Sequence, residues 1–217
     1  KSNKVHINSS PKLVGTYQFA SLAIASELAA NIGVSAENIS SSVTSLQSMP
    51  GRMNILAGIN SSLIIDDTYN SSPIAVKGAL EYLYDLPQTN KIAVLGNMNE
   101  MGDLSKTLHE ELSDYCAKDK LKLLITIGDD INKYLAPLTK EKGINTLQMN
   151  NPYVIGEYLA KNTPPKTAIL FKGSQNGVFL EEAIKPLLAN TQDSNRLVRQ
   201  SENWLKKKRK QFNGVTP

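Results

Sequence analysis

Polar side chains suited to ligand chemistry follow four short apolar runs of this sequence. They lie in the segments 66–73, 96–102, 128–130 and 172–176. A carboxylate such as that of Asp66 or Asp67 can accept hydrogen bonds from both hydroxyls of a ribose. Tyr69 offers a flat face to a base, and Lys172 can pair with a carboxylate or a phosphate. If the fold brings these segments together, the sequence predicts a site for a nucleotide or another anion.

The same residues also have a purely structural interpretation. Asp66 and Asp67 could cap the helix that Pro73 opens, and Gly96 and Gly128 could be ordinary turns at strand ends. His109 lies on a predicted helix beside two glutamates, where a structural or surface role is more typical than that of a general base. These alternatives stay open at the level of the sequence.

The elements that must position these segments alternate between strands and helices. Strands are predicted at residues 62–66, 91–95, 121–127, 145–149 and 168–171, and helices near residues 73–86, 104–118, 130–137, 151–161 and 177–190. Such alternation predicts an α/β fold, a Rossmann-like, mostly parallel sheet with helices on both faces. Residues 54–60 are expected to add an edge strand that pairs with 62–67 across Asn60 and Ser61. Ligands of such sheets bind beyond the carboxyl ends of the strands, where the four polar segments fall.

Two further parts flank this sheet. Residues 16–31 have apolar side chains at helical spacing, Gly33 supplies a stop, and Ser35 to Asn38 look like a cap that opens a second helix. We therefore expect a helical hairpin within residues 1–49, the sheet domain over 50–190, and an added C-terminal helix and tail over 191–217. In the last part, Leu197, Trp204 and Leu205 are expected to pack back on the body.

Composition excludes several classes of protein. With 217 residues, 41% of them hydrophobic, and a single cysteine, the chain is neither a disordered segment nor a disulfide scaffold. Cys116 cannot form an internal disulfide, so a reducing, cytoplasmic location is expected, and no apolar run has the length that a bilayer span needs.

The net charge of +4 depends on the five cations at 206–210, without which 19 cations and 20 acids remain. The body is therefore not expected to bind nucleic acid, and the basic run is either a solvated helix end or a contact for an anionic partner.

Several sequence signatures of catalysis are missing from the printed chain. It contains no phosphate-binding GxxxxGK[ST] loop, no GxGxxG, no HExxH and no GxSxG. Two histidines and one cysteine do not supply a Cys/His zinc site, so no metal site is expected within this chain.

Four motifs, in order, resemble those of the Mur ligase family. The segment PGRM at 50–53, followed by DDTYNSSP at 66–73, is similar to the PGRM and DDxYNANP signature that opens the family's C-terminal domain. LGNMNEMG at 95–102 resembles LGDMxELG, and FKGS at 171–174 resembles VKGS of VKGSR. Within the family, the motifs look most like those of members that join D-alanyl-D-alanine to UDP-N-acetylmuramoyl-tripeptide.

The resemblance implies an ATP- and Mg²⁺-dependent reaction in which a carboxylate is activated as an acyl phosphate and then attacked by an amine. By position, Arg52 would reach the ATP phosphates, Asp67 or Asp66 would hold the ribose, and Tyr69 would lie against the adenine. The residues implied to face the incoming dipeptide are Asn70, Ser72, Lys172, Ser174 and Gln175. The implied partners are UDP-N-acetylmuramoyl-peptide, D-Ala-D-Ala and the rest of the ligase, whose central domain would hold most of the ATP and Mg²⁺ and whose closure would exclude water.

The sequence also departs from the family pattern. Ser72, Asn97 and Gln175 stand where the family has Asn, Asp and Arg, and the loss of that arginine removes a planar, five-donor group from the second substrate's site. Without the phosphate-binding loop, this chain is expected to be inactive alone, as a fragment of a longer ligase or as a gene product that lost its ATPase half. The alternatives are a sister Mur-type ligase with another amine substrate, and a non-catalytic binding module with a docking tail.

Overall fold

The computed structural model describes residues 13–212 of the protein. The chain divides into two compact units between Met49 and Pro50. Each unit is described by itself below. The predicted parts 1–49 and 191–217 extend at their outer ends beyond the described residues.

The first unit contains the two predicted helices, α1 (Thr16–Asn31) and α2 (Ala36–Ser45). Between them Gly33 has a φ of 91°, a backbone conformation that side chains other than glycine's rarely tolerate. Ser35 caps α2 because its hydroxyl accepts a hydrogen bond from the Asn38 amide at 3.3 Å. The stop and cap signals in the sequence therefore predicted this hairpin correctly.

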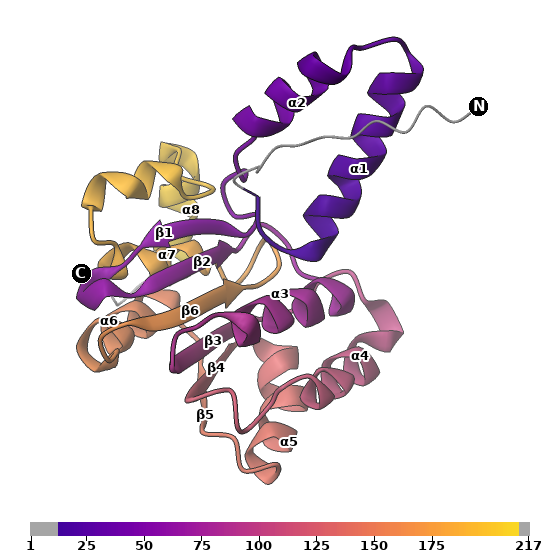
Figure 1. Ribbon diagram of the computed structural model, residues 1–217. Coiled ribbons are helices and arrows are strands. Elements are labelled where there is room, and N and C mark those ends of the chain that lie inside the picture. The colour runs from indigo at the N-terminus through magenta and orange to yellow at the C-terminus, as the bar shows by residue number, and fades with distance from the viewer. Residues whose placement is uncertain (1–12, 213–217) are drawn as a thin grey trace. The chain divides into compact units, whose positions relative to one another are not determined.

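The second unit is built on a six-stranded sheet. Its strands are β1 (Asn54–Ala57), β2 (Leu63–Asp67), β3 (Asn90–Gly96), β4 (Leu123–Ile127), β5 (Thr146–Met149) and β6 (Thr167–Lys172). Their order is β1-β2-β6-β3-β4-β5, and all neighbours are parallel except β1 and β2 (Figure 1). The mostly parallel sheet and its antiparallel edge strand are confirmed. Asn60 and Ser61 lie in the predicted connection, a short 3₁₀ turn at Ile59–Ser61.

Helices cover both faces of this sheet. Figure 1 shows α3 (Pro73–Asp85), α4 (Ser105–Glu111) and α5 (Ala136–Glu141) on one face, with α6 (Pro152–Asn162) and α7 (Glu181–Ile184) on the other. The predicted C-terminal helix is α8 (Glu202–Gln211). Both Leu197 and Trp204 pack on the body as expected, since Leu197 is buried in the core and the Trp204 ring lies 6.0 Å from that of Phe179.

Three predicted helices are shorter or less regular than expected. The predicted 104–118 helix ends at Glu111 and continues as a 3₁₀ turn, and the predicted 130–137 helix begins as a π-helical turn, Ile131–Leu135. The predicted 177–190 helix contains only the four residues of α7, followed by the 3₁₀ turn Lys185–Leu187. It cannot start earlier because Phe179 has a φ of 44°.

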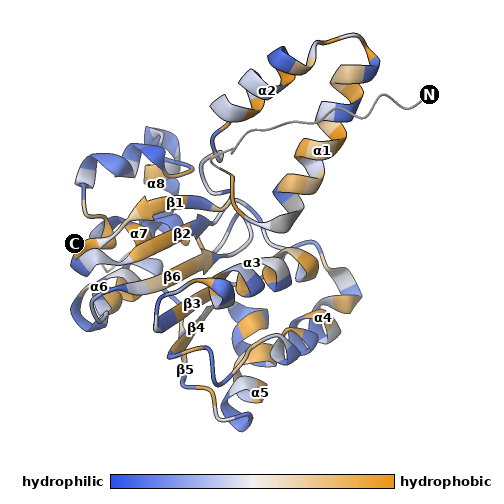
Figure 2. Ribbon diagram, in the orientation of Figure 1, coloured by the Kyte–Doolittle hydropathy of each residue, from blue (hydrophilic) through white to orange (hydrophobic). Residues whose placement is uncertain are grey.

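The core lies between the strands and the helices. Alternate strand residues such as Ile64, Val94 and Phe171 pack with Ile155 of α6 and Ile184 of α7. Figure 2 shows the corresponding concentration of apolar residues along the strands. Because the parallel strands are buried on both faces, their near-continuous apolar runs were readable from the sequence.

Candidate functional site

The strand order brings the four polar segments to one end of the sheet. Strand β6 lies between β2 and β3, and Lys172 is in register with both Asp67 and Leu95. The loops after these strands, 68–72, 97–101 and 173–176, therefore start side by side at the carboxyl edge. This is the edge where parallel sheets bind ligands, at the point where the strand order reverses. The fourth segment, 128–130, follows the adjoining strand β4.

Lys172 and Asp67 form a buried ion pair beneath these loops. Lys172 Nζ lies 2.6 Å from Asp67 Oδ2, and the two side chains are 2% and 4% exposed. Lys172 Nζ also donates to the Asn70 carbonyl at 3.1 Å, and Asp67 Oδ1 accepts from the Met53 amide at 3.1 Å. Burial lowers the pKa of Lys172, while the Asp67 carboxylate opposes that shift. The resemblance implied that both groups face ligands, whereas here they face each other.

Asp66 is a second buried carboxyl group, with no exposed surface. One oxygen accepts from the Thr68 hydroxyl at 2.6 Å and the Thr68 amide at 3.3 Å, and the other accepts from the Gly51 amide at 3.1 Å. Burial raises the pKa of Asp66 to about 6, and the hydrogen bonds from Thr68 and Gly51 limit the rise. The resemblance implied that Asp67 or Asp66 holds a ribose, and both oxygens of Asp66 accept hydrogen bonds from this chain's own groups. Its carboxyl group instead holds the turn at Gly51 against the end of β2.

Gly51 is required at this turn by its backbone and by its neighbours. Its φ is 68°, and its carbonyl accepts the Tyr69 amide at 3.0 Å. A Cβ at this position would lie 3.0 Å from the Tyr69 nitrogen and 2.9 Å from Cγ1 of Val198. Any side chain here would displace the loop that carries Tyr69.

Tyr69 and Arg52 are the accessible members of the predicted nucleotide set. The Tyr69 residue is 41% exposed, and the Arg52 guanidinium lies over its ring at 4.3 Å from the ring centre. This stacked pair presents a cation and an aromatic face together at the loop after β2. It can contact a planar, anionic molecule without any rearrangement of the buried groups below.

The residues implied to contact a dipeptide divide into two kinds. Ser174 is 1% exposed and ties the three loops together, since its hydroxyl accepts from the Asn99 amide at 2.9 Å and contacts the Ser71 carbonyl at 3.3 Å. By contrast, Asn70, Ser72 and Gln175 are half-buried. The Gln175 carbonyl accepts from the Asn99 side chain at 2.6 Å. Hence Ser174 forms part of the frame, and the other three border solvent.

His109 has a structural place, as the sequence indicated. It is fully buried, its Nε2 accepts the Met98 amide at 3.1 Å, and its Nδ1 lies 2.8 Å from the Ser105 carbonyl. These two contacts together require the neutral ring with its proton on Nδ1. His109 thus fixes the loop after β3 at its start. Nearby, the Asn97 side chain accepts the Ile131 amide at 3.0 Å, which connects that loop to the π-helical turn.

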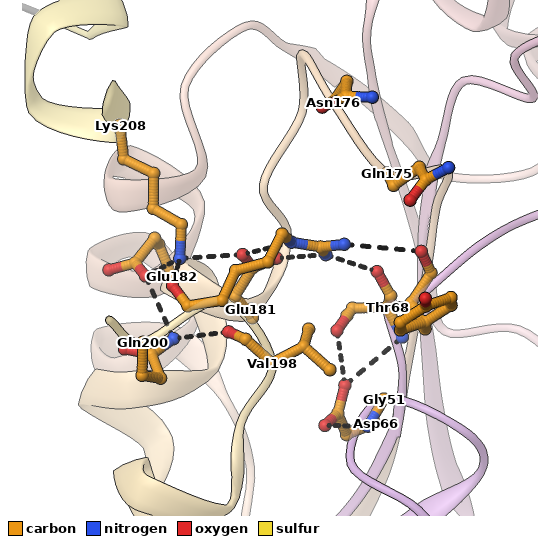
Figure 3. A network of polar contacts seen from close by, with 12 residues as sticks. Gly51, Asp66, Thr68, Gln175, Asn176, Glu181, Glu182, Val198, Gln200 and Lys208 are labelled. Carbon is orange, nitrogen blue, oxygen red and sulfur yellow. Dashed lines mark hydrogen bonds and ion pairs between the residues drawn. The ribbon is translucent and has the colours of Figure 1, made fainter. Parts of the chain in front are cut away.

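A network at the C-terminal segment was missed by sequence reasoning. Arg199 donates to both oxygens of Glu181 at 2.8 and 2.7 Å and to the Thr68 carbonyl at 2.6 Å. Lys208 contacts Glu181 at 2.8 Å and Glu182 at 2.7 Å (Figure 3). The available signal was the pair of acids at 181 and 182 within an otherwise apolar segment, which requires cationic partners if it is buried.

This network corrects the interpretation of the basic run. Lys208 has no exposed surface and is neither a solvated helix end nor a contact for an external anion. Its neighbours Lys206, Lys207, Arg209 and Lys210 are exposed, so the run contains one buried cation and four exposed ones.

A polar pocket of about 280 Å³ lies beside the loops after β3, β4 and β6. It is lined by Asn97, Asn99, Ile127, Gly128, Asp129, Asn150, Asn176, Gly177, Val178, Gln211 and Phe212. Gln211 ends α8 and Phe212 follows it, so the C-terminal segment forms part of the wall at the carboxyl edge of the sheet.

Residues 13–212 contain neither a candidate metal cluster nor a membrane-spanning helix. In this part of the chain, no three His, Cys, Asp or Glu side chains are grouped so that they could hold a metal ion. Nor does any helix within the described range have the length and apolar character to cross a membrane.

Comparison with known proteins identifies relatives for most of the second unit. The family model described as "Mur ligase, glutamate ligase domain" matches residues 51–175. The UDP-N-acetylmuramoyl-tripeptide--D-alanyl-D-alanine ligase of Rickettsia prowazekii is 34% identical over 134 residues, which are 62% of this chain and 29% of that protein. The Bacillus subtilis enzyme of the same name is 26% identical over 81% of this chain and 39% of its own length.

A solved structure of a ligase is also similar to this chain. The MurF ligase from Thermotoga maritima in complex with ADP is similar at a TM-score of 0.62 and 25% identity, covering 89% of this chain and 40% of that one. The chain thus spans at most about two fifths of the length of these relatives.

Proposed function

The chain belongs to the Mur ligase family, and from this premise we propose that it is the C-terminal part of an ATP-dependent ligase that adds D-alanyl-D-alanine to UDP-N-acetylmuramoyl-tripeptide. Support comes from relatives of that name, which match 62% and 81% of this chain. In this proposal residues 1–49 are the end of the ATPase domain, and the reaction takes place in the cytoplasm during synthesis of peptidoglycan precursors.

The nucleotide contact is proposed for Arg52 and Tyr69. Both are exposed, they are stacked at 4.3 Å, and the turn at Gly51 and Asp66 fixes the backbone below them. An adenine can extend the stack on the aromatic ring, and the guanidinium can pair with phosphate oxygens. This exposed pair above a buried frame is the observation on which the proposal rests. The related MurF ligase named above was crystallised with ADP, which is consistent with it.

The buried groups support the site rather than contact a ligand. Asp67 and Lys172 neutralise each other and fix the ends of β2 and β6, while Asp66 holds Gly51 and Thr68. We therefore propose that these three residues position the loops, in place of the ribose and carboxylate contacts that the resemblance implies. A preorganised loop requires less reorganisation when the reactants meet.

The incoming dipeptide is proposed to lie against Asn70, Ser72 and Gln175. These side chains border solvent on loops that meet at Ser174, and their amides and hydroxyl can bond a peptide backbone. The amine of the dipeptide attacks the activated carboxyl carbon, phosphate leaves, and an amide forms. No residue of this chain is assigned to Mg²⁺, because the described carboxylates are not grouped to hold it.

The test is phosphate release by the full-length enzyme supplied with ATP and UDP-N-acetylmuramoyl-tripeptide. D-Ala-D-Ala should support release, whereas D-Ala, L-Ala and D-Glu as single amino acids should not. Equal release with a single amino acid would overturn the dipeptide assignment. Tight ATP turnover by the 217 residues alone would contradict the division of labour with a separate ATPase domain.

A sister ligase with another amine substrate is the second candidate. It is favoured by Gln175, which stands where the family pattern has arginine. An amide has no charge with which to pair a substrate carboxylate, so an amine that lacks a free carboxylate would suit this position better. The same assay with amidated D-Ala-D-Ala separates the candidates, because only the second predicts that it is preferred.

A further inference from the structure

The C-terminal segment beyond the matched family region contacts the loop that carries Tyr69. Arg199 Nη2 donates to the Thr68 carbonyl at 2.6 Å, and Nη1 lies 3.4 Å from the Tyr69 carbonyl. The family match ends at residue 175, whereas Arg199 lies 24 residues later. The guanidinium thus bonds the Glu181 carboxylate of α7 as well as the Thr68 carbonyl.

Buried charges fix the orientation of Arg199. Its side chain is 8% exposed and binds both oxygens of Glu181, which is fully buried. Lys208 holds Glu181 from another side at 2.8 Å and also donates to the Arg199 carbonyl at 2.8 Å. A planar guanidinium with two oxygens on one edge presents its remaining N–H groups in a fixed direction. Here that direction is toward the carbonyls of residues 68 and 69.

The backbone beside Arg199 also contacts the same loop. Arg199 has a φ of 55°, which is unusual for a residue with a side chain. Val198 approaches Gly51 so closely that a Cβ on Gly51 would lie 2.9 Å from it. The segment 198–199 and the turn at Gly51 thus hold the Tyr69 loop between them.

Tyr69 is therefore fastened through its main chain at two points. Its amide donates to the Gly51 carbonyl at 3.0 Å, and its own carbonyl and that of Thr68 face Arg199. The residue remains 41% exposed, and its ring contacts Arg52. An exposed ring keeps a defined direction only if its backbone is held from below.

We propose that Arg199 is a positioning residue for nucleotide binding, which orients the exposed Tyr69 ring toward an adenine by bonding the carbonyls of residues 68 and 69. This inference rests on the proposed function. It assigns the C-terminal segment a role in substrate binding that extends beyond the stability of the fold. A residue that only stabilised the fold would change the melting temperature without selectively changing the use of ATP.

The test compares R199K with R196K in the full-length enzyme. R199K keeps a cation beside the buried Glu181 but removes the guanidinium N–H groups that reach the carbonyls of residues 68 and 69. Arg196 lies in the same segment, is 51% exposed in its side chain, and contacts Asp193 and Asn54 instead. R196K is thus a matched Arg-to-Lys change without contact to the loop.

Two quantities are measured for each variant: KM and kcat with varied ATP, and hydrogen exchange of the Tyr69 amide. R199K should raise KM for ATP about tenfold, leave kcat at saturating ATP within about twofold, and speed exchange of that amide about tenfold. R196K should match the wild type in both measurements. E181Q leaves Arg199 present but weakens the ion pair that holds it, so it should raise KM for ATP by a smaller factor than R199K does. This variant replaces R199K in the test if R199K does not fold.

The outcomes distinguish the two proposals. A wild-type enzyme that releases no phosphate from ATP with any amine overturns the proposed function. An active wild type with an unchanged KM for ATP in R199K and E181Q overturns the positioning role. Equal increases in KM for ATP in R199K and R196K would also overturn it. The effect would then come from any change in this segment and not from the contact of Arg199 with the Tyr69 loop.

Discussion

Lys172 Nζ and Asp67 Oδ2 lie 2.6 Å apart, although 105 residues separate them in the chain. They end the neighbouring strands β6 and β2, and both are almost completely buried. Two charges that the resemblance implies for ligand contact thus form a buried ion pair with each other beneath the loops. This relationship leads to the first prediction.

Removing either partner of this pair should destabilise the chain strongly. K172M and D67N should each lower the free energy of unfolding by about 3–5 kcal/mol, because each leaves an uncompensated buried charge. Denaturant unfolding of the 217-residue chain measures the effect. The double variant should lose less free energy of unfolding than the sum of the two single variants. E110Q provides a control, since its exposed pair with Lys106 at 3.9 Å should contribute less than about 1 kcal/mol.

Asp66 should make stability depend on pH between about 4 and 6. Its pKa in the folded chain is about 6, above the ordinary value of 3.8. The folded state therefore binds the proton more tightly, and this contribution is fully present below pH 3.8 and is lost as the pH rises through 6. The loss amounts to about 3 kcal/mol at most. The free energy of unfolding, measured at pH 4.5 and 7.5, should show this decrease in the wild type and not in D66N.

The aromatic ring of Tyr69, and not its hydroxyl group, should determine nucleotide affinity. In the full-length enzyme, Y69F should keep KM for ATP within about twofold, and Y69A should raise it about tenfold, since stacking of a base on a ring contributes about 1–3 kcal/mol. Steady-state kinetics with varied ATP measure both variants. A Y69F defect as large as that of Y69A would contradict stacking.

Lys208 should anchor helix α8. K208M leaves the buried carboxylates of Glu181 and Glu182 without a shared cation, and we expect a loss of about 3–5 kcal/mol. Trp204 is the only tryptophan of the chain and packs on Phe179, so its fluorescence should shift to the red as α8 detaches. K210M, a change to an exposed cation of the same helix, should leave both stability and emission unchanged.

Cys116 should resist thiol reagents in the folded chain. It is 6% exposed, and burial raises the pKa of its thiol to about 12, so almost no thiolate is present at pH 8. Labelling by a disulfide reagent should be slow in buffer and should accelerate across the unfolding transition in denaturant. Rapid labelling without denaturant would mean that the region around Cys116 opens locally.

The sequence by itself determined the α/β class, the positions of the strands and the identity of the family motifs. Buried parallel strands must be apolar along their whole length, and helices need apolar residues at regular spacing, so both leave local patterns. The edge strand and the Ser35 cap were also readable from local patterns, whereas the sequence left the role of His109 open. Helix ends were less readable, as α7 shows, because the positive φ of Phe179 comes from its surroundings.

Only the tertiary structure decided which of the polar residues are exposed. Asp66, Asp67, Tyr69 and Lys172 lie in motifs of similar polarity, yet three are buried and one is accessible. The difference arises because β6 is placed between β2 and β3, which brings Lys172 to Asp67 across 105 residues. Likewise, Arg199 and Lys208 gain their partners only when the C-terminal segment packs on α7. Charge pairing depends on distance in space, and local sequence patterns do not contain that distance.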